Sequence, residues 1–137
     1  MSWMRGKKHS RRARRGTATV ELAVVSPLLF AMLFGIIEFG WLFSVQNTLV
    51  NAAREGARLG ILQGVGSDEV EARVVQYLQP MNLDNKVTIN VTEATPDDPF
   101  VTVVVTVPRE DVSLVGNFFG FVGGTLEGRA SMRKEGM

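Results

Sequence analysis

The chain has 137 residues, enough for one small domain, and 45% of them are hydrophobic, which is ordinary for a globular protein. The absence of cysteine excludes disulfide frameworks, cysteine-ligated zinc and cysteine nucleophiles. The net charge of +1 conceals an asymmetry, because residues 1–16 hold seven Lys and Arg and no acid, which leaves eight bases against fourteen acids elsewhere. Cations gathered in one terminal run do not form the basic face of a nucleic-acid-binding domain, so we expect no nucleic-acid partner.

A long apolar stretch at residues 22–45 has Glu38 as its sole ionisable group. A bilayer core needs roughly 20 helical residues, so the stretch is long enough to span the lipid. The preceding cations predict that residues 1–16 stay cytoplasmic as a leader and that the C-terminal portion is exported. A cleaved signal peptide and a buried soluble helix are the competing interpretations. The first usually has a shorter apolar region, and the second would need more protein to cover it.

Glu38 lies toward the outer third of this predicted span. An intramembrane carboxylate is costly without a polar partner, so two interpretations stay open. Glu38 either makes a polar contact that selects a partner transmembrane helix, or reaches outward to the membrane interface.

The helix is predicted to cover residues 17–62, with an amphipathic second half. Glu55 and Arg58 are spaced for a weak ion pair at i,i+3. Gly56 and Gly60 are spaced for close approach, either to another helix or to the protein's own sheet. Small and apolar residues recur on one face of this half, at Val45, Leu49, Ala52, Ala53, Gly56, Ala57 and Gly60.

The junction between the basic run and the apolar stretch has Gly16, then Thr17, and then Glu21 just before the lipid-compatible residues. This arrangement resembles the prepilin-peptidase site of type IV pilin-like proteins. The resemblance implies cleavage after Gly16, Thr17 as the new N-terminus, and Glu21 as the acid at the fifth position of the mature chain. Because a carboxylate in a low-dielectric setting needs a partner, we expect the new amino group to pair with a Glu21 carboxylate, its own or that of a neighbouring subunit. The plainer interpretation is that Gly16 is a spacer and Glu21 an acid that complements the helix dipole.

Residues 16–60 are similar to the TadE-like family of the tight-adherence (Tad/Flp) pilus system. The similarity rests on Pro27 in the apolar run, the IIEFG segment around Glu38 and the AAREGAR segment at 52–58. Leu22 departs from the aromatic residue that major Flp pilins carry after the Glu, and the chain is longer than those pilins. The resemblance therefore implies a minor pilin-like subunit in the bacterial inner membrane, with a prepilin peptidase, other pilin-like subunits and Tad assembly proteins as partners.

Residues 67–137 are expected to form a small extracytoplasmic α+β domain that packs on the long helix. Ser67 and Asp68 are predicted to cap a helix at 69–79, which Pro80 ends. Strands are predicted at 86–92, half-buried, at 100–107, buried on both faces, and at about 125–133. The Phe- and Gly-rich segment 114–124 is expected to be a short helix on the sheet, or else a loop that contacts a membrane or partner.

No phosphate loop, HExxH pair or nucleophile elbow appears in the sequence. We therefore expect no enzyme activity, no cofactor and no metal, and a function in subunit packing. The alternative is an unprocessed single-pass membrane protein whose outer domain binds a ligand or partner.

Overall fold

The computed structural model describes residues 10–116 and 123–134. Helix α1 spans Ser10–Gly60 and continues through Pro27 without interruption. It begins inside the predicted leader. Two compact units divide the chain, the first ending at Ile37 and the second starting at Glu38, so α1 contributes to both.

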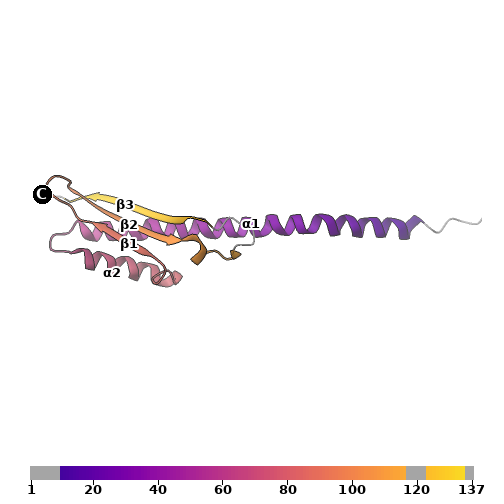
Figure 1. Cartoon of the computed structure of the whole chain (residues 1–137), viewed down its shortest axis with the longest axis horizontal. Helices are drawn as coiled ribbons and strands as arrows, with labels where there is room; N and C mark the ends of the chain where they lie inside the picture. Colours follow the sequence, from indigo (N-terminus) through magenta and orange to yellow (C-terminus); the bar gives the residue numbers. More distant parts are fainter. Residues whose placement is uncertain (1–9, 117–122, 135–137) are drawn as a thin grey trace, which may run out of the picture. The chain divides into compact units, whose positions relative to one another are not determined.

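The second unit contains the α+β domain. After α1 come α2 (Ser67–Leu78), the 3₁₀ turn η1 (Gln79–Met81), β1 (Thr88–Thr92), β2 (Phe100–Pro108), the 3₁₀ turn η2 (Arg109–Asp111) and β3 (Thr125–Arg133). The strands form one antiparallel sheet in the order β1-β2-β3 (Figure 1). The predicted α+β class, with a long helix and a small antiparallel sheet, is confirmed.

One face of the sheet is covered by α1 and α2. Along β2 the alternate residues Val101, Val103, Val105 and Val107 are buried, because they face the two helices. The intervening residues, such as Val104, are only half-buried, since no element within residues 10–116 and 123–134 covers the other face. The prediction that this strand is buried on both faces is therefore wrong. The core is completed from α1 by Val45, Leu49, Ala52, Ala53 and Ala57, and from α2 by Val70, Val74 and Leu78.

Small residues of α1 and β3 allow this close packing. A Cβ on Gly56 would lie 2.6 Å from Val74 Cγ2, and one on Gly60 would lie 2.8 Å from Val101 Cγ1. A Cβ on Gly128 of β3 would overlap the α1 backbone at Leu49. Of the two roles considered for Gly56 and Gly60, the structure thus shows packing against the protein's own domain.

Helix α2 begins two residues earlier than predicted, and its N-cap residue is Gly66. Neither Ser67 nor Asp68 caps it through a side chain. Instead the Ser67 N–H donates to the Glu93 carboxylate at 3.1 Å, so a side chain 26 residues away satisfies one of the free N–H groups at the helix start. The predicted cap was wrong because this acceptor lies far away in the sequence.

The other predictions for this domain had mixed outcomes. Strand β3 occupies the predicted residues, and β1 is shorter than predicted but shows the expected alternation of half-buried and exposed residues. Within segment 114–124, Gly116 is in a 3₁₀ turn, whereas residues 114–115 and 123–124 are not helical. Residues 117–122 of that segment lie outside the described part of the chain.

Candidate functional site

The predicted processing segment lies on α1. Gly16, Thr17 and Glu21 are all exposed and helical, and a Cβ on Gly16 would meet no other atom within 4 Å. The bond between Gly16 and Thr17 is therefore sterically open. In a helix, however, it is not in the extended form that proteases usually bind, so cleavage would require the first turns to unwind.

The apolar residues that follow in the first unit are exposed. Every large hydrophobic residue from Val20 to Ile37 is exposed, with an exposed fraction of 45–73%. Among the described residues, α1 contains the one helix long and apolar enough to cross a membrane, and the most apolar window within Gly16–Gly60 is wholly unburied. Such a surface is unfavourable in water, and a membrane anchor accounts for it.

Glu38 contacts a loop of the protein's own domain. One carboxylate oxygen, Oε2, accepts hydrogen bonds from the backbone N–H groups of Leu114 and Val115, at 2.9 and 3.0 Å. One turn further along α1, the Trp41 indole N–H donates to the Val112 carbonyl at 2.7 Å. These three bonds fasten the described part of the loop after η2 to α1. Sequence reasoning missed this contact, because the partners are 71 to 77 residues away and offer only backbone atoms.

The AAREGAR segment of α1 contacts α2 through buried small residues and through an ion pair at the surface. Its small residues enter the core, whereas Glu55 remains at the surface and bonds two cations. Glu55 accepts from Arg58 at 2.9 Å, which confirms the predicted i,i+3 pair, and from Arg73 of α2 at 2.9 Å. The hydrogen bonds from these two guanidinium groups stabilise the carboxylate and lower the pKa of Glu55 to about 2. Exposed pairs of this kind contribute little to stability and mainly set the register of the two helices.

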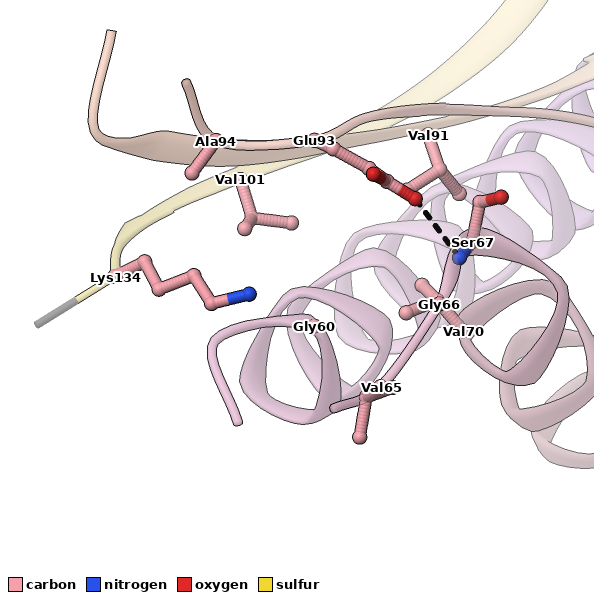
Figure 2. Close-up of a pocket in the computed structure, with 10 residues that line it drawn as sticks. All are labelled: Gly60, Val65, Gly66, Ser67, Val70, Val91, Glu93, Ala94, Val101 and Lys134. Atoms are coloured by element: carbon pink, nitrogen blue, oxygen red, sulfur yellow. Dashed lines mark hydrogen bonds between the residues drawn. The ribbon is translucent and has the colours of Figure 1, made fainter. Parts of the chain in front are cut away.

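A small cavity lies where α1 ends and α2 begins (Figure 2). Its volume is about 40 Å³, and its polar lining includes Glu93 and Lys134. Figure 2 shows the Glu93 carboxylate on the Ser67 N–H and the Lys134 side chain extending toward the last turn of α1 at Gly60. A cavity of this size holds one or two water molecules, and a small-molecule ligand needs several hundred Å³. This cavity is therefore too small for a small-molecule ligand.

Comparison with known protein families gives a match, and it lies on α1. The family described as TadE-like protein matches residues 16–58, which run from the predicted cleavage position to the end of the AAREGAR segment. This match confirms the resemblance found in the sequence. Neither a curated protein nor a solved structure matches the chain significantly.

Proposed function

From the TadE-like match over residues 16–58, we propose that the chain is a membrane-anchored, minor pilin-like subunit of a Tad/Flp-type pilus assembly or secretion system. It acts by helix packing and subunit assembly and not by catalysis. The observation that carries this proposal is the double use of α1. Its residues before Glu38 expose a continuous apolar surface, and its residues after Val45 supply the core of the α+β domain.

The basic run before Gly16 sets the orientation in this proposal. Cations flanking a span are retained on the cytoplasmic side, so the leader lies inside the cell and the α+β domain outside the inner membrane. A prepilin peptidase cuts after Gly16, and the subunit then presents Thr17 as its N-terminus. Glycine and β-branched threonine are weak helix formers, which lowers the cost of unwinding the turn around the cleaved bond.

Glu21 has an assembly role in the same proposal. The new amino group of Thr17 pairs with a Glu21 carboxylate, its own or that of a neighbouring subunit, because a carboxylate in low-dielectric surroundings needs a cationic partner. Glu21→Gln is expected to leave cleavage intact and to reduce co-purification with other pilin-like subunits. Loss of cleavage in Glu21→Gln would place Glu21 in peptidase recognition instead.

The N-terminus of the membrane-extracted protein tests the processing step. Intact mass and N-terminal analysis should give Thr17 as the first residue in cells with the prepilin peptidase, and the full leader in cells without it. Gly16→Asp should block cleavage, whereas Gly6→Asp adds the same charge to the leader and should be cleaved normally. The same N-terminus in both strains would refute processing.

Fractionation tests the anchor separately. The full chain should remain with membranes after alkaline carbonate washing and dissolve only in detergent. A monomer that is soluble without detergent would refute both the anchor and the assignment to a pilus.

A further inference from the structure

Strand β3 forms an edge of the sheet, and within residues 10–116 and 123–134 it pairs with β2 alone. Two backbone hydrogen bonds just beyond the ends of β3 show which of its residues direct their N–H and C=O groups toward β2. The Arg109 N–H donates to the Gly124 carbonyl at 3.1 Å, and the Lys134 N–H donates to the Pro99 carbonyl at 2.8 Å. Hydrogen-bonded pairs alternate along an antiparallel ladder, so the even-numbered residues of β3 bond to β2.

The odd-numbered residues of β3 consequently direct their backbone N–H and C=O groups away from the sheet. Within residues 10–116 and 123–134, one of these groups has a recorded partner, the Glu127 carbonyl, which accepts from the Gln46 amide. A carbonyl has two lone pairs and can accept a second bond. The other outward groups belong to Thr125, Glu127 (its N–H), Arg129, Ser131 and Arg133, and all five residues are exposed.

The other edge of the sheet is arranged differently. Strand β1 has α2 beside it (Figure 1), and it is the shorter strand, with five residues against nine in β3. Proteins usually protect a long edge with a proline, a bulge or a covering element. The sequence of β3 contains no proline, and its register with β2 runs without a bulge from Thr125 to Arg133. The exposed side chains of β3 stand on the outer face, and among the described residues Gln46 is the one side chain recorded on the outward backbone groups of this edge.

Charge identifies the strand that fits this edge. Glu127 and Arg129 lie two residues apart on the outer face, and neither has an ion pair among the described residues. We propose that β3 binds β3 of a second copy of this chain, antiparallel and centred on Gly128, so that Glu127 of each copy lies opposite Arg129 of the other. In this register Thr125 lies opposite Ser131, and the two sheets join into one of six strands.

One competing symmetric register is less favourable. A register centred on Arg129 overlaps the whole strand but places the two Arg129 guanidinium groups opposite each other, and like charges in directly opposed positions destabilise strand pairing. The proposal deepens the assembly role given above, because it names the surface through which copies meet. It does not depend on cleavage after Gly16, so the N-terminal analysis and the experiments below fail independently.

Cysteine cross-linking of the full chain in membranes tests the register, since the natural sequence has no cysteine. Two differently tagged variants, Thr125→Cys and Ser131→Cys, should form a mixed dimer with a short thiol cross-linker when they are co-expressed. Either variant expressed alone should form far less. Thr88→Cys with Thr92→Cys on β1 provides an exposed control pair. Equal cross-linking of the control pair, or of Ser131→Cys alone, would overturn the proposal.

A charge exchange tests the partner. Glu127→Arg and Arg129→Glu each place like charges in opposed positions, and each should lower the cross-linked dimer by about fivefold or more. Co-expression of the two variants restores opposite charges at both positions and should return the dimer to the wild-type level. Both residues are exposed, and Trp41 fluorescence would verify folding. No recovery in the mixture, or cross-links that join β3 only to a different protein, would overturn the proposal.

Discussion

Gly128 is the position at which a single added methyl group should disturb the domain most. A Cβ there would lie under 3 Å from three backbone atoms of α1, the carbonyl carbon and oxygen of Leu49 and the amide nitrogen of Val50. Backbone atoms cannot rotate away as a side chain can. Since carbon atoms pack favourably at about 3.5–4 Å, β3 would have to move away from α1 by about 1 Å.

The cost of this movement follows from the neighbouring packing. A gap of about 1 Å removes roughly half of the dispersion energy at each affected contact, and Leu126 and Ala130 flank Gly128 on the same buried face. Overpacking of a close-packed core usually costs about 1–3 kcal/mol, and rigid backbone favours the upper part of that range. We expect Gly128→Ala to destabilise the domain by about 2–3 kcal/mol, which lowers Tm by roughly 10 °C or more.

Thermal unfolding of the full chain in detergent, followed by Trp41 fluorescence and circular dichroism, measures this effect. Gly123→Ala is the matched control, because its Cβ would meet nothing within 4 Å and the same substitution changes the unfolded chain equally. Gly56→Ala should also destabilise the domain, but less than Gly128→Ala, since its Cβ would meet the Val74 side chain and not backbone atoms, and alanine gains helix propensity. A Tm for Gly128→Ala equal to that of Gly123→Ala would refute the close approach of β3 to α1.

Two further substitutions test the surface contacts of α1. Glu38→Ala removes the acceptor of the Leu114 amide, so hydrogen exchange at that amide should accelerate about tenfold, whereas Glu38→Gln keeps a carbonyl oxygen and should change it little; unchanged exchange in Glu38→Ala would exclude the contact. Glu55 has a pKa of about 2 in the fold against about 4.5 in the unfolded chain, so its contribution to stability is present above about pH 4.5 and is lost as the pH falls toward 2. The urea midpoint of the wild type should accordingly exceed that of Glu55→Gln at pH 7 and converge with it near pH 2, and a constant difference would contradict the lowered pKa.

Much of the fold could be predicted because it follows from local periodicity. The bounds of β3 and the alternation in β1 come from residues that are neighbours in sequence, and the long helix from its apolar run and the small residues after Val45. A pattern of this kind reports which face of an element is buried. It does not report what covers the other face, which is why the double burial expected for β2 was wrong.

The contacts that the sequence did not indicate are long-range and involve backbone atoms. The carboxylate of Glu38 and the N-terminus of α2 are satisfied by groups 26 to 77 residues away. The sequence did not indicate the role of Gly128 either, since a glycine within a strand pattern indicates only that the strand is locally less stable. Its role depends on the helix backbone that passes beneath it.

The processing and assembly predictions for Gly16, Thr17 and Glu21 remain predictions. They concern a reaction with another protein, and the structure shows only that these three residues are exposed on a helix. The family match supports them through the residues it includes, and chemical analysis of the N-terminus is the direct measurement.

In the proposed orientation, the shared helix also determines where a protease could release the α+β domain from the membrane. A protease that cuts after Gly60 would leave behind Val45, Leu49 and the alanines that fill the centre of the core, and the released fragment would collapse. A cut before Glu38 would liberate a domain with its core and its loop contacts intact. In the proposed orientation, folding of the α+β domain must equally wait until the last turns of α1 have crossed the membrane, so export and folding would be coupled through one helix.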